Sequence, residues 1–342
     1  MSEVKKKQRY YYKNIGDLRK DLREALPYEL LVELHRPKAW RHFLTLFRQL
    51  ALLAFGIWLA ASFDAVWAWL SGSFIIGFVV FDFTVLLHEV IHNAIFAKRR
   101  PFWNGVLGWL YALPSGISRT QFTHWHLDHH NELGSWEDDP KRAHLTPRTI
   151  KRWVKLLYMT PALFPIYFRA AAKECSGYTP DLQKTIAFER KITIATHISI
   201  MALLIVFAGF WVFIKVYAVP YFLIFPIAFT INRVGQHYSI NPDDPAQWST
   251  LMKGNWFWDF IYINSNYHLE HHYFPGVPFY HLPRLQRSLG AFYQSRGMKY
   301  QSYGAVLYGW FIQNHAPHTN WSKTDNNVTP TSLKSASDLL FP

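Results

Sequence analysis

Residues 43–87 read FLTLFRQLALLAFGIWLAASFDAVWAWLSGSFIIGFVVFDFTVLL, and this stretch decides the fold. Only three charged side chains interrupt it, those of Arg48, Asp64 and Asp82. A helix needs about 20 apolar residues to cross a bilayer, so a run of this length can cross twice. Asp64 lies near the middle of the run and marks the outer turn. The run predicts a membrane hairpin with helices at about 43–62 and 65–87.

A second apolar run, residues 192–231, has the length of another hairpin. Lys215, Pro220 and Pro226 interrupt it, and we place Lys215 at the outer turn between spans at about 192–212 and 216–231. The composition agrees with a membrane protein, because 15 Trp and 19 Tyr can supply interfacial belts. We therefore expect an all-α integral membrane bundle of four transmembrane helices.

Two hairpins leave the N-terminus, the polar segment 96–191 and the C-terminal part on one side of the membrane. Basic residues cluster on that side, before the first span and after the second: Lys5, Lys6, Lys7, Arg9, Lys13, Arg19, Lys20, Arg23, Lys98, Arg99 and Arg100. The positive-inside rule makes this side cytoplasmic, in a bacterial inner membrane or, alternatively, in the endoplasmic reticulum. Anionic headgroups attract such clusters, so the net charge of +13 does not require a nucleic-acid partner.

The chain divides into three expected parts: a cytoplasmic N-terminal segment 1–42, a main domain 43–318 and a flexible tail 319–342 that is rich in Ser, Thr, Asn and Asp. The first 40 residues are charged and lack the apolar core of a cleavable signal peptide. The single cysteine, Cys175, excludes an intrachain disulfide and a chain-ligated iron–sulfur cluster.

Histidines stand in three tight boxes and one outlying position. The boxes read HEVIH at residues 88–92, HLDHH at 126–130 and HLEHH at 268–272, and His237 is the outlier. Spacings of three and four residues place side chains on one face of a helix. A core does not need clustered imidazoles, whereas metal ions do, and imidazole suits iron, copper, zinc and nickel. The histidines exceed the four ligands of one tetrahedral zinc, so we expect two metal ions.

These boxes resemble those of the membrane-bound fatty acid desaturase family, in order and separation. NYHLEHHYFPGVP at residues 266–278 looks like the family's third box and its Phe-Pro tail, and HHNELGSWEDDP at 129–140 looks like its second. The resemblance covers about residues 50–285. It implies a cytoplasmic helical cap on the four-helix bundle that holds two iron ions, with O2 as co-substrate. Carried over by position, the ligands would be His88, His92, His126, His129, His130, His237, His268, His271 and His272.

Residues around the ligands are assigned by the same comparison. Animal acyl-CoA desaturases have an Asn four residues before the outlying histidine that reaches one metal through water, but Arg233 stands there and Asn232 precedes it. Asn232 is therefore a candidate. Five further residues are candidates for holding imidazoles from behind: Glu89, Asp128, Glu270, Asp138 and Asp139. The last two could alternatively cap a helix. For the first three, plain surface acidity is an equally good interpretation.

The remaining candidates concern the substrate. Asp82 is expected to face protein or a substrate channel, and His124 to lie off the ligand face. Aromatic residues of the spans could line an acyl tunnel or simply pack: Trp58, Phe78, Phe81, Phe225 and Phe229. A closed-ended tunnel would let an acyl chain enter from the cytoplasmic side and would fix the double-bond position by depth. The head group, whether coenzyme A, carrier protein or glycerolipid, stays open.

Other classes compete with this prediction. HEVIH is also a literal HExxH, the zinc motif of intramembrane metalloproteases, but that interpretation leaves the other histidines idle. A histidine-rich metal carrier would need histidines along the spans, where only His197 lies. Within the enzyme class we expect oxygen-dependent desaturation of a fatty acyl chain, because NYHLEHH at residues 266–272 looks most like acyl desaturases. The alternatives are lipid hydroxylation, sphingolipid desaturation and carotenoid oxidation, which begin with the same hydrogen abstraction.

The electron donor is predicted to be a separate protein of the ferredoxin or cytochrome b5 type. No His-Pro-Gly-Gly haem loop occurs, and one cysteine cannot hold a ferredoxin cluster. A basic surface could dock an acidic donor or could meet headgroups. Its expected members are Lys141, Arg142, Arg148, Lys151, Arg152 and Lys155.

Overall fold

The structure is a computed structural model that describes residues 9–135, 137–147, 151–238, 240–241 and 243–315. Among these residues there are helices and no strands, and one isolated bridge pairs Met252 with Gln301. Four helical stretches are long and apolar enough to span a membrane, and these are Ala39–Ser62, Val66–Ile91, Pro180–Ala208 and Phe210–His237. The prediction of an all-α bundle with four spans is thus confirmed. The expected tail 319–342 lies outside the described residues.

The first hairpin consists of α4 (Ala39–Ser62) and α5 (Val66–Ile91). The two helices approach closely through small residues, because a Cβ on Gly72 would lie 2.7 Å from the Ala60 nitrogen. Such contacts are what membrane helices use in place of a hydrophobic driving force. α5 is the central helix, with 78% of its apolar window buried, against 17% for α4. Its last turn carries the first histidine box.

The second hairpin turns earlier than expected. α10 (Pro180–Leu203) continues through a π-helical turn, η2 (Leu204–Ala208), and the chain reverses at Gly209, whose φ of 90° favours glycine. Lys215 is not at this turn. It lies inside the next helix, where its ammonium donates to the Phe63 carbonyl at 3.1 Å and to Asp64 Oδ1 at 3.0 Å. The expected turn at Lys215 is therefore wrong, and the lysine instead joins the outer end of one hairpin to the other.

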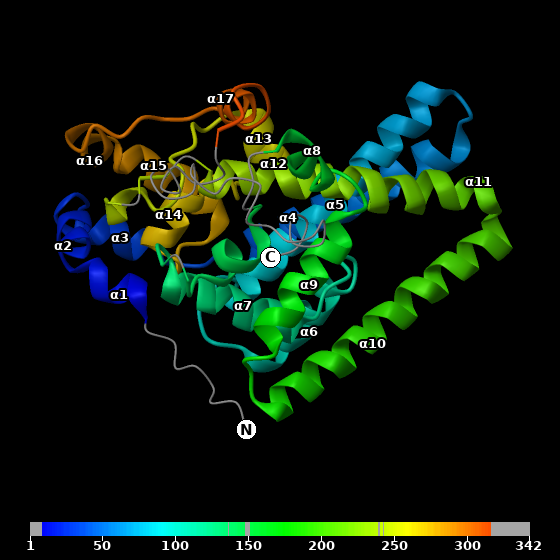
Figure 1. The fold of residues 1–342 in the computed structure, drawn as a ribbon, viewed down its shortest axis with the longest axis horizontal. Coiled ribbons are helices and arrows are strands. Elements are labelled where there is room, and N and C mark those ends of the chain that lie inside the picture. The colour runs from blue at the N-terminus through cyan, green and yellow to red at the C-terminus, as the bar shows by residue number, and fades with distance from the viewer. Residues whose placement is uncertain (1–8, 136, 148–150, 239, 242, 316–342) are drawn as a thin grey trace, which may run out of the picture.

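The fourth span changes helical form along its length. It runs through α11 (Phe210–Phe213), the π-helical segments η3 (Ile214–Ala218) and η4 (Pro220–Ile224), and α12 (Phe225–His237). Figure 1 shows α10 as a long rod that diverges from the bundle and meets α11 at the same edge as the tip of the α4–α5 hairpin. Only 6% of the apolar window of α10 is buried. α10 is thus the peripheral span.

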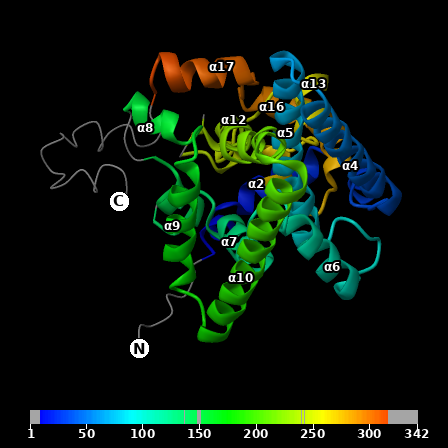
Figure 2. The same cartoon turned by 90° about the vertical axis from the view of Figure 1, so that its right-hand side faces the viewer.

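Short helices fill the remainder of the chain. They are α1 (Tyr10–Asn14), α2 (Gly16–Glu24), α3 (Tyr28–Leu34), α6 (Pro101–Ala112), α7 (Arg119–Glu132), η1 (Lys141–Leu145), α8 (Arg152–Leu157), α9 (Leu163–Cys175), η5 (Pro245–Gln247), α13 (Trp256–Ile261), α14 (His268–Tyr273), η6 (Phe279–His281), α15 (Leu282–Ser288), α16 (Gly290–Ser295), α17 (Tyr303–Leu307) and η7 (Tyr308–Ile312). In Figure 1, α1–α3 and α14–α16 form a cap at the end of the bundle opposite the outer turns. Figure 2 shows α6 and α17 at the periphery.

The segment between the hairpins also enters the bundle. The loop at residues 113–117, between α6 and α7, packs against the middle of α5, where Ser115 Oγ donates to the Val80 carbonyl at 3.4 Å. Val80 precedes the end of α5 by eleven residues, which is about 16 Å at helical rise. We expected 96–191 to stay outside the membrane, so this inserted loop differs from the prediction. Hydrogen bonds within the protein satisfy part of its backbone, since the Gly116 N–H and His197 Nε2 both reach the Leu113 carbonyl.

Candidate metal centre

All nine predicted histidines converge at the end of the bundle next to the cap. They fall into two groups whose ring nitrogens lie within 4.8 Å of one another in each: His88, His92, His126, His130 and His271 form the first, and His129, His237, His268 and His272 form the second. They come from the last turn and C-cap of α5, the second half of α7, the end of α12 and the whole length of α14. Each box is split between the groups except the first.

The first group brings the Nε2 atoms of different helices face to face. His92 Nε2 lies 2.8 Å from His126 Nε2, and His271 Nε2 lies 2.9 Å from His130 Nε2. His88 Nε2 is buried and has no hydrogen-bond partner within the described residues. An unpaired buried nitrogen beside four other imidazoles is the arrangement that a bound cation resolves.

The second group forms a chain of facing nitrogens. His237 Nε2 lies 3.1 Å from His129 Nε2 and 3.0 Å from His268 Nε2, which lies 3.0 Å from His272 Nε2. A neutral imidazole has one N–H and one lone pair, so this set cannot be satisfied internally when the other nitrogen carries the proton. The donor set and its geometry therefore fit a metal ion.

Burial keeps these imidazoles neutral. It lowers the pKa of the α7 and α14 histidines well below the ordinary value, and neighbouring charges lower it further. Neutral imidazole is the form that binds metal, so the clusters are ready as ligands without first losing protons.

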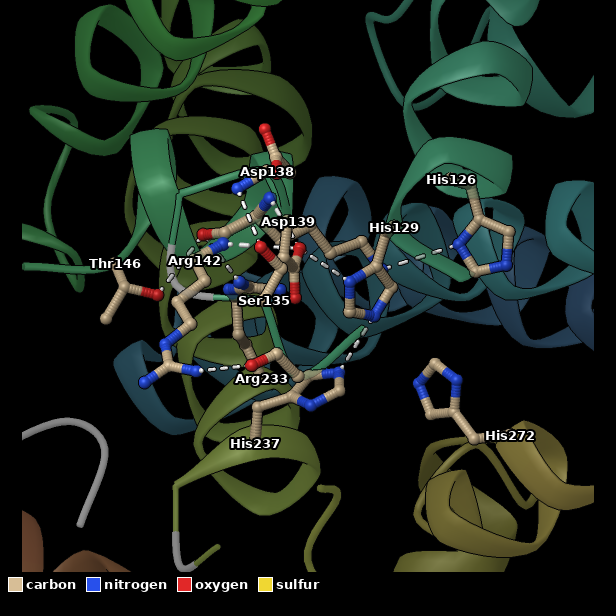
Figure 3. Close-up of polar contacts among 12 residues, drawn as sticks. His126, His129, Ser135, Asp138, Asp139, Arg142, Thr146, Arg233, His237 and His272 are labelled. Carbon is tan, nitrogen blue, oxygen red and sulfur yellow. Dashed lines mark hydrogen bonds and ion pairs between the residues drawn. The ribbon is translucent and has the colours of Figure 1, made fainter. Parts of the chain in front are cut away.

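Asp139 supports the second group from behind. Its Oδ1 accepts from His129 Nδ1 at 2.8 Å, which turns the Nε2 lone pair of His129 towards His237, as Figure 3 shows. The same oxygen accepts from the backbone N–H of Lys141 at 3.0 Å, at the start of η1. Burial raises the pKa of Asp139, and His237, Lys141 and Arg233 oppose that rise. Asp139 thus contacts an imidazole and also accepts from the first backbone N–H of η1.

The other acidic candidates lie in different places. Glu89 Oε1 lies 3.6 Å from His88 Nδ1, and Oε2 accepts from the Phe279 N–H at 3.1 Å, which ties α5 to η6. Glu270 Oε1 accepts from Gln286 at 2.8 Å and Tyr293 at 2.7 Å, and burial raises the pKa of Glu270 to about 7.

Asp128 and Asn232 complete the set of candidates. Asp128 accepts from the Tyr178 hydroxyl at 3.3 Å. Asn232 donates to Ser265 Oγ at 2.8 Å and accepts from Gln236 at 2.8 Å, and all three line a cavity that the metal site shares. His124 is exposed and packs beside Tyr178, as its spacing predicted.

An apolar cavity opens directly onto the histidines. Four of them line it, and it encloses about 1210 Å³, including space open to the outside. Of the five aromatic residues considered for a tunnel, three line it: Phe81, Phe225 and Phe229. Trp58 is 53% exposed, and Phe78 packs against Tyr262. Asp82 is buried near Arg48, with Oδ1 unpaired in the described structure.

Lys141 belongs to the site rather than to a surface patch. Its Nζ lies 3.4 Å from His126 Nδ1, and it lines the cavity. Burial, followed by the charge of Arg233, lowers the pKa of Lys141 to about 7, against the opposing effect of Asp139. No local pattern predicts this position, because a lysine after Asp-Asp-Pro looks like any surface lysine.

The expected basic docking surface is only partly at the surface of the described structure, where Arg152 is exposed and Lys151 half-buried. Arg142 and Lys155 are buried, and Lys155 donates to the Trp310 carbonyl, Asn314 Oδ1 and the His315 carbonyl. Arg152 donates to the carbonyls of Phe311 and Ile312. These side chains hold the end of η7, where helical carbonyls lack partners. Arg148 lies outside the described residues.

The zinc-protease interpretation does not fit this geometry. His88 and His92 lie in a group of five imidazoles, which exceeds the three protein ligands of a catalytic zinc. Glu89, the general base of an HExxH enzyme, instead accepts a backbone hydrogen bond from Phe279.

Clustered histidines beside an apolar cavity, in a bundle with four candidate membrane spans, define a membrane protein whose site is suited to a metal ion and an apolar ligand. The profile of the family described as "Fatty acid desaturase" matches residues 65–304. The chain therefore belongs to the fatty acid desaturase family, and it is a membrane oxidoreductase of lipid metabolism. The resemblance proposed from the histidine boxes is confirmed.

Curated proteins that are similar to this chain are also lipid desaturases. The human sphingolipid delta(4)-desaturase is 26% identical over 268 residues, which cover 73% of this chain and 75% of the relative. The Drosophila melanogaster sphingolipid delta(4)-desaturase is 25% identical over 255 residues, covering 73% and 75%. The human sphingolipid delta(4)-desaturase/C4-monooxygenase is 26% identical over 261 residues, with 72% of each chain covered.

Proposed function

We propose that this protein is an oxygen-dependent desaturase that places a double bond in the hydrocarbon chain of a lipid. The observation that supports the proposal is that the histidine centre and the cavity share residues. His88, His126, His268 and His271 line the same apolar cavity that could hold the hydrocarbon chain. The balanced reaction converts –CH2–CH2–, O2, two electrons and two protons into –CH=CH– and two waters. Iron is the metal whose redox chemistry, when bound by these histidines, supplies an oxidant strong enough for an unactivated C–H bond.

The chain's own residues would do the remaining work. The first group of five histidines and the second group of four would hold one ion each, at the cytoplasmic end of the bundle. Asp139 orients His129, and Glu89 lies behind His88. The aromatic wall excludes water and favours an alkyl chain by about 0.8 kcal/mol per buried methylene. Substrate affinity would thus come from the cavity and reactivity from the centre.

A sphingolipid is the substrate to test first, with a fatty acyl lipid second. The relatives are named for sphingolipid delta(4) desaturation. The cavity also supports oxidation near a polar end, because several of its polar residues lie close to the histidines in space or in the chain: Lys141, Asn232, Arg233, Gln236 and Ser265. A lipid head group placed there would leave the alkyl chain to the aromatic part.

The electron donor would be a separate ferredoxin or cytochrome b5. The basic side chains that we first assigned to donor docking are partly buried, so the docking face stays unassigned. Purified protein should turn over when a donor chain of either type is added, and should stay idle without one. Full turnover with a chemical reductant alone, unchanged by any added donor, would contradict a protein donor.

The experiment that tests the function is lipid analysis of an expressing host, combined with iron determination on the purified protein. We expect about two iron ions per chain and a new unsaturated lipid, absent from a host that expresses His268→Ala. Hydroxylated lipid in place of unsaturated lipid would assign the chain to the monooxygenase branch. One zinc per chain with an unchanged lipid profile would overturn the proposal.

A further inference from the structure

The inserted loop at residues 113–117 meets α5 at Val80, eight residues or about 12 Å along the helix from His88. Ser115 and Ile117 line the cavity, together with Phe164 and Phe225. Ser115 Oγ donates to the carbonyls of Val80 and Tyr111 at 3.4 and 3.2 Å, so the loop is fixed to α5 and α6. A loop bound in this way can act as the floor of the cavity.

His197 of α10 holds the loop from the other side. Its Nε2 lies 2.8 Å from the Leu113 carbonyl, and its Nδ1 lies 2.6 Å from the Tyr217 hydroxyl. Nε2–H therefore donates to the carbonyl, and Nδ1 accepts from the phenol. The proposed metal centre does not include this histidine. It is a polar group in a span that is otherwise little buried, and such groups in membranes are rarely placed without a purpose.

Gly116 brings the loop into contact with Tyr221. Its φ of 71° is in the left-handed region, and a Cβ there would overlap the Tyr221 hydroxyl. The glycine thus allows the phenol to rest on the loop backbone. Tyr221 stacks on Phe164 at a centroid distance of 5.4 Å and on Phe225 at 5.7 Å, both of which line the cavity.

Tyr221 is one rung of an aromatic ladder with a period of four. Stacked or tilted neighbours follow one another along the fourth span at Phe213, Tyr217, Tyr221, Phe225 and Phe229. An α-helix of 3.6 residues per turn would carry such a series around its axis. The π-helical segments η3 and η4 have wider turns and so keep the rungs aligned. Two residues of this series, Phe225 and Phe229, line the cavity. The series continues past Tyr221 to Tyr217 and Phe213, away from the histidines.

Tyr221 is not one of the residues that line the cavity; it lies directly behind two of them, Phe164 and Phe225. We propose that Tyr221, seated between Gly116 and Phe164, backs the end of the cavity and sets how long an alkyl chain the enzyme accepts beyond the metal centre. His197 is the positioning residue that keeps the loop against Tyr221. The proposal rests on the proposed function for its substrate, a long-chain lipid. The physical basis is steric. The terminal methyl group of the alkyl chain can go no further than the point where the apolar lining is backed by the Tyr221 ring, which rests on the polar backbone of the loop.

The test uses Tyr221→Ala, with Leu223→Ala as the matched control on the same segment, because Leu223 is 46% exposed on the outer face. Both are expressed with a graded series of saturated lipids, and the unsaturated products are measured by chain length. Tyr221→Ala should shift the preferred chain to longer homologues, by about fourfold for each newly buried methylene. Tyr221→Phe keeps the ring and should keep the length preference. Leu223→Ala should match wild type.

His197→Ala tests the positioning role. We expect a broader length distribution with unchanged iron content, because the loop loses its tie to α10 and the histidine groups do not. His197→Gln, whose amide can still donate to the Leu113 carbonyl, should restore part of the selectivity. A purely structural role would lower yield and iron together and would leave the length distribution of the remaining product unchanged.

Failure of this inference is distinguishable from failure of the function. A binding assay in which saturated lipids of graded length compete for the protein measures the order of their affinities. This order depends on the depth of the cavity and requires no desaturation. The inference is overturned if Tyr221→Ala, with normal iron content, keeps the wild-type length order in that assay. The function is overturned if wild type forms no unsaturated product while the length order shifts as expected. If Tyr221→Ala does not fold, Tyr221→Leu replaces it in the same assay.

Discussion

Single histidines differ in role according to which way they point, even on one helix. His126 and His124 both lie on α7, two residues apart. The first lies in a group of five imidazoles, and the second is exposed. Two residues along a helix turn a side chain to a different face, so spacing alone separates a ligand from its neighbour.

Replacing His126 by Ala should remove iron and abolish desaturation, since each lost imidazole leaves a metal without one of its ligands. The same outcome is expected for Ala at His130, His268 or His272. Metal analysis and product formation on purified protein provide the measurement. His124→Ala is the control and should keep both. Full iron and full turnover in a double variant of the four ligands would show that the assignment is wrong.

Asp139→Asn should lower the affinity of the second histidine group for its metal ion and should disturb the fold much less. An amide nitrogen would oppose His129 Nδ1–H, and loss of such a carboxylate partner lowers metal affinity by roughly 10–100-fold. Competition with a chelator measures the change. Asp138→Asn, one residue earlier, serves as the comparison and should be far milder.

Helix placement in this protein depends on polar clamps at helix ends. Glu189 of α10 is buried and accepts from Ser118 Oγ at 2.6 Å, from the Thr120 N–H at 2.8 Å and from Thr120 Oγ1 at 2.6 Å. These groups form the N-terminus of α7, where a carboxylate is favoured by the helix dipole. The peripheral span thereby fixes the helix that carries the second histidine box.

Glu189→Ala should destabilise the protein by about 2 kcal/mol or more, because it leaves buried donors without an acceptor. Glu189→Gln keeps one acceptor oxygen and should lie between that variant and wild type. Thermal unfolding in detergent and the iron content of the purified proteins measure the order of stability among wild type, Glu189→Gln and Glu189→Ala. Asp181→Ala, on the same helix and with a fully exposed carboxylate, should leave both unchanged. Equal effects at Glu189 and Asp181 would contradict the clamp.

At the scale of the whole molecule, the two histidine groups join four elements that are distant in the chain. α5, α7, α12 and α14 come together there, and the cap closes over them. Glu132 accepts from the N–H groups of Arg9 and Tyr10, and Tyr11 donates to the His272 carbonyl at 3.2 Å. Metal binding should therefore stabilise the bundle and the cap together.

Removing the metal with a strong chelator should lower the unfolding temperature by several degrees. A ligand present at about 100 times its dissociation constant contributes roughly 2.7 kcal/mol, and that contribution disappears on chelation. Calorimetry before and after chelation, and after iron is returned, measures it. In His126→Ala and His268→Ala the chelator should have a smaller effect. An unchanged unfolding temperature in wild type would mean that the histidine groups are stable without metal.

The sequence by itself determined the four spans, the histidines that meet and the family. Those features are local: about 20 apolar residues insert as a helix wherever they occur, and spacings of three and four residues fix a helical face. The division of the nine histidines into five and four was not predictable, nor was the inward position of Lys141, because both depend on how α5, α7, α12 and α14 are packed. The place of Lys215, the inserted loop and the contact of Gly116 with Tyr221 likewise join residues far apart in the chain. Tertiary packing alone decides such contacts, since no local pattern distinguishes a lysine or glycine that will be buried from one that will not.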